Sequence, residues 1–326
     1  GFWPPAPNAR DYAALLKSTY RAVKDVDPTA TVGGMVVAGM DYGYVEAVLK
    51  AGAAGSFDFA GVHPYRYPRA PEDTPALDEE LRRMQSLLKR YGASTRLWIT
   101  EMGYPTHTGA SGVSESRQAE MLARSYLLGL SVPGVERFYW YDFLNDGPDR
   151  SYNEHNFGVV RTDLSPKPAY VTLTALTKTI GTKPPLKRYG GRSSDDYALA
   201  WGSDRQGYAV AVWSAGSPGT FLFDCPSGEA EVCDLTTISL VRLRGSRLAV
   251  PAVGLPHIIL MRSLPKMTRF AEPVLSLTPA ETVPGETTSA TLQISRKFTR
   301  WLASAADEGR GRFRMILSDS ESAPVR

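Results

Sequence analysis

The stretch RLWITEMGYPT, from Arg96 to Thr106, ends an apolar run on a carboxylate and continues with a glycine, a tyrosine and a proline. Its apolar residues suit a strand that is covered on both faces, as in a parallel sheet. Glu101 therefore stands at the carboxyl end of a predicted buried strand. Such a carboxylate either pairs with an arginine or caps the next helix, or it belongs to a site at the edge of the sheet.

Predicted helices and strands alternate on both sides of this stretch. Apolar residues at helical spacing predict helices, and short apolar runs between turn residues predict strands. The predicted strands cover residues 31–39, 57–65, 96–101 and 137–143. The predicted helices cover residues 8–26, with Asn8 as N-cap, 44–54, 75–91, 114–130 and 167–180. Strands that alternate with helices over about 180 residues predict a parallel sheet of βα units.

Polar and aromatic side chains gather where the predicted strands end. These side chains are His63 and Tyr65, then Glu101, then Trp140 and Asp142. In a (β/α)8 barrel the carboxyl ends of the strands carry the active site. No glycine-rich nucleotide-binding motif follows any of the strands, so the pattern favours a barrel. An open-sheet α/β protein with an unrelated ligand is the alternative.

Glu101, His63 and Tyr65 together suit a nucleophile with its supporting groups. An imidazole and a phenol hydroxyl beside a carboxylate hold its geometry and tune its charge. Taken alone, His63 is more simply a structural histidine, and Trp140 is more simply a core residue. At the end of a barrel strand, however, an indole also offers a flat platform for a sugar ring.

Several other kinds of site have little support. The chain has four histidines and neither an HExxH motif nor a CxxC pair, so we expect no metal and no cofactor. A GxSxG elbow is also missing. The net charge is only +3, and its excess lies between Arg296 and Arg326, so no nucleic-acid surface is expected on the main body. No apolar run approaches the ~20 residues of a membrane helix.

A different pattern begins after Gly181. Residues 196–216 alternate apolar and polar side chains around a DRQG turn, and short strands continue to Met261. This pattern predicts an antiparallel β-domain. Cys225 and Cys233 lie within it, and their spacing is compatible both with free thiols and with a disulfide.

Three segments follow from these patterns. Residues 1–182 form the α/β domain, and residues 183–264 form a β-sandwich domain. Residues 265–326 contain too few predicted strands for a second sandwich. We therefore expect them to be a linker with an incomplete β-domain or a disordered tail.

The order of HPY, WITEMGYPT, FYWYDF and NFGVVRTDLSPKPAYVTLTAL resembles the second half of the retaining glycoside hydrolases of clan A, close to families 39 and 5. The resemblance covers about residues 1–264 and implies that the clan's strand-7 nucleophile is Glu101. It also implies that His63 and Tyr65 support this nucleophile and that Trp140 is the strand-8 tryptophan of the substrate floor. The last βα unit matches at Phe157, Gly158, Lys167, Pro168, Ala169 and Tyr170.

The fold implied by the resemblance is the C-terminal half of a (β/α)8 TIM barrel, strands 5 to 8, followed by an antiparallel β-sandwich. The reaction implied is O-glycosyl hydrolysis of an oligo- or polysaccharide by retaining double displacement. The residues expected to contact the sugar are Trp140, Trp3 and Asp142. The rival interpretation is a non-catalytic carbohydrate-binding or cell-surface protein that keeps the aromatic cleft. For the full-length protein we expect a secreted or cell-envelope location.

One part of the clan's site has no counterpart in the sequence. A retaining glycosidase needs a second carboxylate roughly 5 to 5.5 Å from the nucleophile, and in this clan it belongs to an Asn-Glu-Pro motif. No such tripeptide occurs in the chain. We therefore expect the acid/base and the first four strands to precede Gly1, and the chain alone to be inactive or unstable. Asp142 or Glu154 could replace the acid/base, but loop or sugar-contacting roles are simpler.

Overall fold

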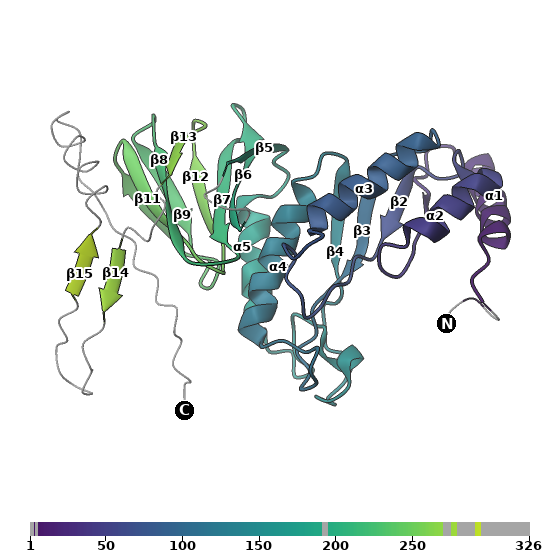
Figure 1. Cartoon of the computed structure of the whole chain (residues 1–326), viewed down its shortest axis with the longest axis horizontal. Helices are drawn as coiled ribbons and strands as arrows, with labels where there is room; N and C mark the ends of the chain where they lie inside the picture. The colour runs from purple at the N-terminus through teal and green to yellow at the C-terminus, as the bar shows by residue number, and fades with distance from the viewer. Residues whose placement is uncertain (1–2, 4–5, 191–194, 270–274, 279–290, 295–326) are drawn as a thin grey trace. The chain divides into compact units, whose positions relative to one another are not determined.

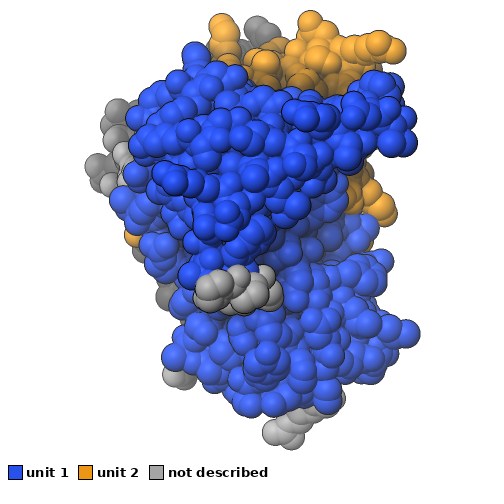
Figure 2. Space-filling model, turned by 90° about the vertical axis from the view of Figure 1, so that its right-hand side faces the viewer, with its two compact units in different colours: residues 1–174 blue, residues 175–326 orange. Residues whose placement is uncertain are grey.

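The chain folds into two compact units, residues 1–174 and residues 175–326 (Figure 2). A computed structural model describes residue 3 and residues 6–190, 195–269, 275–278 and 291–294. Unit 1 holds a parallel sheet with helices, and unit 2 holds antiparallel sheets (Figure 1). Within these described ranges, no helix has the length and apolar character needed to cross a membrane.

Unit 1 contains a four-stranded parallel sheet in the order β1-β2-β3-β4. The strands are β1 (Gly33–Gly34), β2 (Phe59–Val62), β3 (Leu97–Met102) and β4 (Val135–Trp140). The helices are α1 (Ala9–Val26), α2 (Tyr42–Val48), the π-helix η1 (Leu49–Ala53), α3 (Leu77–Arg90), α4 (Glu115–Leu130), the 3-10 helix η2 (Asn153–Asn156) and α5 (Pro168–Thr179), which runs into unit 2. The predicted alternation of helices with parallel strands is confirmed.

The strand predicted over residues 31–39 is much shorter in the structure. Only Gly33 and Gly34 pair regularly with β2. Met35 then takes a positive φ of 62°, which breaks the extended geometry that a strand needs. Ala38 returns to the sheet through an isolated bridge to His63. The apolar run therefore follows the edge of the sheet without forming one continuous strand.

The sequential strand order places the helices on one face of the sheet. Right-handed crossovers between neighbouring parallel strands put successive helices on the same side. Figure 1 shows α3 and α4 next to each other over the sheet. A doubly wound sheet instead reverses its strand order and carries helices on both faces. The order β1-β2-β3-β4 contains no such reversal.

The two faces of the sheet carry different side chains. Ile99 and Phe138 face α4, and Ile99 is fully buried. On the opposite face the ring of Trp98 stacks on Phe59 with a centroid distance of 3.8 Å and lies 6.3 Å from the ring of Tyr139. Tyr139 is 47% exposed. The second face is thus an aromatic surface that the described residues leave partly open.

Unit 2 contains two antiparallel sheets, ordered β10-β9-β12-β7-β6-β5 and β11-β8-β13. The strands are β5 (Pro185–Tyr189), β6 (Asp196–Ser203), β7 (Gly207–Ser214), β8 (Gly219–Asp224), β9 (Glu229–Cys233), β10 (Leu240–Arg244), β11 (Arg247–Ala252), β12 (His257–Met261) and β13 (Lys266–Arg269). Val210 and Val212 of β7 share one hydrophobic core with Phe221 and Phe223 of β8. Face-to-face packing of two sheets explains this shared core. The predicted antiparallel β-region is confirmed.

The segment 265–326 begins with β13, which is the third strand of the sheet β11-β8-β13. Further on, β14 (Leu275–Thr278) pairs antiparallel with β15 (Thr291–Ile294). The rest of the expected linker and tail lies outside the described residues.

Cys225 and Cys233 are both buried free thiols. Of the two possibilities that the sequence left open, the structure contains the unlinked one. Burial raises the pKa of the Cys233 thiol to about 11. This thiol therefore stays protonated at neutral pH and reacts poorly as a nucleophile.

A close backbone approach at Gly103 can be tested by substitution. A Cβ on Gly103 would lie 1.9 Å from the carbonyl oxygen of Tyr141, and a backbone oxygen cannot rotate away. Gly103→Ala should lower the free energy of unfolding by about 1 to 3 kcal/mol, because the two segments must separate. A Cβ on Gly55 would meet no atom within 4 Å, so Gly55→Ala is the control. Urea denaturation compares the two variants, and an unchanged midpoint for Gly103→Ala would contradict the close approach.

Candidate active site

Glu101 lies at the end of β3, where the pairing with β4 becomes irregular. The register shifts between Ile99 and Met102, and both of these residues are fully buried. The Glu101 side chain between them is 41% exposed. The irregular pairing thus brings a carboxylate to the carboxyl edge of the sheet while its neighbours stay in the core.

Two side chains that follow β2 meet this carboxylate. The Tyr65 hydroxyl donates a hydrogen bond to Glu101 Oε2 at 3.1 Å, and His63 Nδ1 lies 3.5 Å from the same oxygen. The carboxyl ends of β2 and β3 meet at one edge because these strands are parallel neighbours. The structure therefore brings together the three residues that the sequence pattern grouped.

Burial determines the protonation of both supporting groups. Burial, reinforced by the Glu101 charge, raises the pKa of Tyr65 far above its ordinary value. The hydroxyl therefore stays protonated and acts as a donor. Burial also lowers the pKa of His63, although the Glu101 charge opposes this effect. A neutral imidazole at neutral pH follows, and its tautomer decides whether Nδ1 donates to the carboxylate.

Aromatic rings hold Tyr65 in place. Its ring makes edge contacts with Tyr67, Tyr141 and Phe157 at centroid distances of 6.1, 6.3 and 5.9 Å. Phe157 is buried and also contacts Tyr141 at 5.3 Å. Edge-to-face contacts at these distances are favourable. The hydroxyl that donates to Glu101 is thus carried by a ring with little freedom to move.

The FYWYDF segment presents Tyr141, and not Trp140, to this aromatic cluster. Trp140 stacks on Tyr104 and on Tyr126 of α4, with centroid distances of 6.2 and 6.4 Å. Its Nε1 is buried without a hydrogen-bond partner among the described residues. Trp140 therefore packs on the helix side, in phase with Phe138, and its contact with a sugar stays a prediction. Residue type alone favoured the indole, whereas the two-residue alternation along β4 was the signal for Tyr141.

Trp3 lies against α1. Its half-buried ring makes an edge contact with Tyr12 at a centroid distance of 6.3 Å. The Tyr12 hydroxyl accepts a hydrogen bond from the backbone amide of Met35. In the described part of the chain no contact joins Trp3 to Glu101, so its role toward a sugar also stays a prediction.

Asp142 follows Tyr141 and lies among other acidic groups. One of its oxygens, Oδ1, is buried and has no hydrogen-bond partner within the described residues. Burial, together with the charges of Asp146 and Glu154, raises the pKa of Asp142 to about 7, while Lys167 opposes the shift. At neutral pH the carboxyl group is therefore partly protonated and can either donate or accept a hydrogen bond. The structure leaves its predicted contact with a sugar untested.

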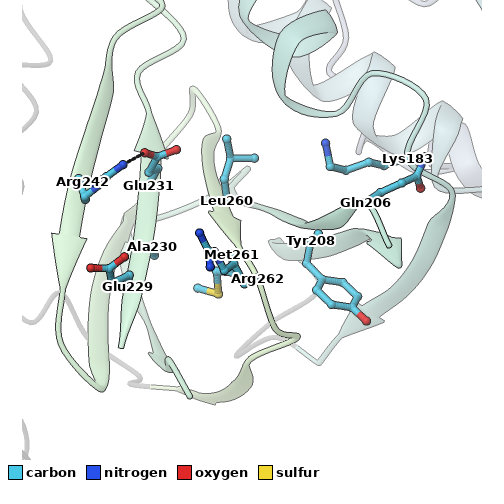
Figure 3. Close-up of a pocket in the computed structure, with 11 residues that line it drawn as sticks. Lys183, Gln206, Tyr208, Glu229, Ala230, Glu231, Arg242, Leu260, Met261 and Arg262 are labelled. Carbon is cyan, nitrogen blue, oxygen red and sulfur yellow. Dashed lines mark hydrogen bonds and ion pairs between the residues drawn. The ribbon is translucent and has the colours of Figure 1, made fainter. Parts of the chain in front are cut away.

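A pocket of about 360 Å³ lies in unit 2 on the six-stranded sheet (Figure 3). Arg242 pairs with Glu231 at 3.3 Å on its wall, and Leu260 lies beside them. Ligand sites are mostly apolar clefts with a few polar groups, whereas five of the eleven residues that line this pocket are charged. Across the described ranges, no group of three or more His, Cys, Asp or Glu side chains could hold a metal ion.

Several solved structures resemble the chain, and they are glycoside hydrolases. A family 39 glycoside hydrolase from Bacteroides cellulosilyticus has a TM-score of 0.63 and 26% identity, over 77% of this chain and 54% of its own. A glucosidase from Croceicoccus marinus has a TM-score of 0.54 and 17% identity, over 81% and 65%. A family 39 β-xylosidase from Caulobacter crescentus has a TM-score of 0.50 and 18% identity, over 81% and 64%. No protein-family model and no curated protein matches the chain.

The chain is therefore structurally similar to clan A glycoside hydrolases over 77 to 81% of its length. It spans 54 to 65% of the length of these three structures. The match includes a helix-covered parallel sheet followed by antiparallel sheets. At this level the fold expected from the sequence resemblance is confirmed.

Asp142→Asn should change how stability depends on pH. The pKa of Asp142 rises from its ordinary value of 3.8 to about 7 in the folded chain. The folded state thus holds the proton more tightly between these values, and stability falls as the pH rises through this window. Asparagine cannot ionise, so the variant should melt at a higher temperature than the wild type at pH 8, with little gain at pH 4.

Asp163→Asn is a control whose stability should change in the opposite direction. Hydrogen bonds from Ser165 lower the pKa of Asp163, so Asp163→Asn should lose stability at pH 8. Thermal unfolding followed by circular dichroism at both pH values measures the two variants. A gain for Asp142→Asn that is equal at pH 4 and pH 8 would contradict the raised pKa.

Proposed function

We propose that the chain carries the nucleophile part of the active site of a retaining glycoside hydrolase. The observation that supports this most is the placement of Glu101 at a strand end, with Tyr65 at 3.1 Å and His63 at 3.5 Å from one carboxylate oxygen. The structural likeness to glycoside hydrolases supports the class of reaction. In this proposal β1 to β4 correspond to strands 5 to 8 of a (β/α)8 barrel, and unit 2 is an appended β-sandwich.

The expected reaction is a double displacement. Glu101 attacks the anomeric carbon while the glycosidic bond breaks and an acid protonates the leaving oxygen. Water then attacks the glycosyl ester, gives a proton to the conjugate base of that acid, and releases the sugar with retained configuration. Tyr65 holds Oε2, so Oε1 is the oxygen that attacks. Because Tyr65 keeps its proton, this hydrogen bond persists while Glu101 gains and loses the sugar.

Tyr141 takes the substrate-contacting role that the sequence resemblance assigned to Trp140. Its ring contacts Tyr65 directly, at a centroid distance of 6.3 Å, whereas Trp140 packs toward α4. A tyrosine ring can support the apolar face of a sugar, and its hydroxyl can bond a sugar hydroxyl. Asp142, the next residue along the chain, would accept or donate a further bond to the sugar.

The described residues do not supply the second carboxylate that a double displacement needs. Glu154 lies close enough to raise the pKa of Tyr65 and Tyr141, but it is hydrogen-bonded within its own turn to Asn153 at 3.0 Å. We propose instead that further βα units supply the acid/base. Within the described residues, β1 and β4 each pair on one side only, so both edges of the sheet could accept further strands. In the closed barrel, Tyr139 on the aromatic face would then be covered.

Glu101→Gln tests the nucleophile assignment in the full-length polypeptide that this proposal requires. Glutamine keeps the size of the side chain but cannot form the glycosyl ester, so hydrolysis of aryl glycosides should fall at least about a thousandfold. A 2-fluoro glycoside should label the wild type on the peptide that contains Glu101, as seen by mass spectrometry. Glu136→Gln is the matched control, because Glu136 pairs with Arg96 on the same sheet.

The outcomes separate the competing functions. Loss of turnover and of labelling in Glu101→Gln, with normal activity in Glu136→Gln, supports the proposal. Wild-type turnover by Glu101→Gln ends the nucleophile assignment. A full-length protein that binds oligosaccharides without hydrolysing any of them would instead be the carbohydrate-binding protein of the rival interpretation.

A further inference from the structure

Lys167 is a buried cation whose three donors are all used. The side chain is 1% exposed, and its Nζ donates to Thr106 Oγ1 at 3.0 Å, to Asn145 Oδ1 at 2.9 Å and to the Asn156 carbonyl at 3.2 Å. All three acceptors are neutral. A buried ammonium is unfavourable unless each of its N–H groups finds an acceptor. The surrounding backbone must therefore hold these acceptors around Lys167.

The three acceptors belong to three different segments. Thr106 lies in the loop after β3, Asn145 lies in the loop after β4, and Asn156 ends η2. Backbone bonds join the same segments: the Thr106 amide donates to the Asn156 carbonyl at 3.0 Å, and the Asn145 amide donates to the Val160 carbonyl at 2.9 Å. Lys167, just before α5, thus lies where the segments converge.

Each of these segments also carries or adjoins part of the candidate site. The first follows Glu101, the second follows Asp142, and the third leads directly into Phe157. Phe157 in turn contacts the ring of Tyr65 at 5.9 Å. Movement of the segments relative to each other would therefore disturb the groups that surround the Glu101 carboxylate.

The charges around Lys167 come from several elements. Burial lowers its pKa to about 8, and the nearby cations Arg161 and Arg150 act in the same direction, while Glu115 and Asp142 oppose the shift. Lys167 is therefore charged at neutral pH and loses its proton above about pH 8. Asp142 is the candidate site residue among the groups that face it.

We propose that Lys167 is a positioning residue, which holds the loops after β3 and β4 and the end of η2 so that Tyr65, Phe157 and Asp142 keep their places around Glu101. Lys167 itself makes no contact with Glu101 among the hydrogen bonds of the described residues. Its effect on the reaction rests on the proposed function, but its effect on the loops does not. The two can therefore be measured separately.

Lys167→Met tests the effect on the loops in the chain itself. Methionine has a similar length and removes all three donors. Hydrogen exchange of backbone amides in residues 103–113 and 142–160 should become at least about tenfold faster, while exchange in β7 and β12 stays unchanged. Lys17→Met is the control, because Lys17 also binds a carbonyl, that of Ala51 at 3.1 Å, but belongs to α1. Wild-type exchange of both loops in Lys167→Met overturns the proposal.

The kinetic readout uses the full-length enzyme. A displaced reacting geometry should lower kcat about 100-fold while KM changes less than about threefold, because misplacement by about 1 Å can cost that much. A loss through instability alone would lower the fraction of enzyme that the 2-fluoro glycoside labels and leave kcat per labelled site unchanged. Normal kcat in Lys167→Met overturns the proposal. An inactive wild type removes the proposed function, and hydrogen exchange then still decides the role of Lys167.

Asn145→Ala provides the second variant if Lys167→Met does not fold. This change removes one acceptor and leaves the lysine bonded to Thr106 and Asn156. Exchange should then accelerate in residues 142–150 by about fivefold or more and change little in residues 103–113. Unchanged exchange in residues 142–150 overturns the proposal.

Discussion

Parallel hydrogen bonding between β2, β3 and β4 is the constraint on which the candidate site depends. Ala60, Gly61 and Val62 pair in register with Leu97, Trp98 and Ile99. Because neighbouring parallel strands point the same way, the residues that follow β2 arrive beside the residue that ends β3. The parallel pairing of β2 with β3 thus brings His63 and Tyr65 to Glu101, although they are more than 35 positions apart in the sequence.

The same constraint explains how much of this arrangement was predictable. The grouping of Glu101 with His63 and Tyr65 needed only the strand assignments, because parallel topology places their ends together. The distinction between Trp140 and Tyr141 also needed the two-residue alternation along β4, which places Trp140 with Phe138 against Tyr126 and leaves Tyr141 to Tyr65. In the structure Tyr141 is the ring that contacts Tyr65, while Trp140 packs on α4.

Lys167 illustrates a second limit of reasoning from sequence. Lysine is almost never fully buried, and the sequence around Lys167 does not mark it as an exception. Its burial depends on acceptors that three separate segments supply only after folding. Likewise, the apolar run at residues 31–39 had strand composition, but the positive φ of Met35 ends regular pairing there. Both features arise from tertiary structure and leave no local pattern.

The Tyr65 hydroxyl stays protonated, so any sensitivity of this site to pH must come from other groups. The phenol keeps its hydrogen across the whole biological pH range, so Tyr65 itself adds no dependence on pH. The groups that do change charge near neutrality are Asp142 and Lys167, with pKa values of about 7 and about 8. A change of pH near neutrality would thus act through Asp142 and Lys167, whereas stronger acidity would charge His63, whose Nδ1 lies 3.5 Å from Glu101 Oε2.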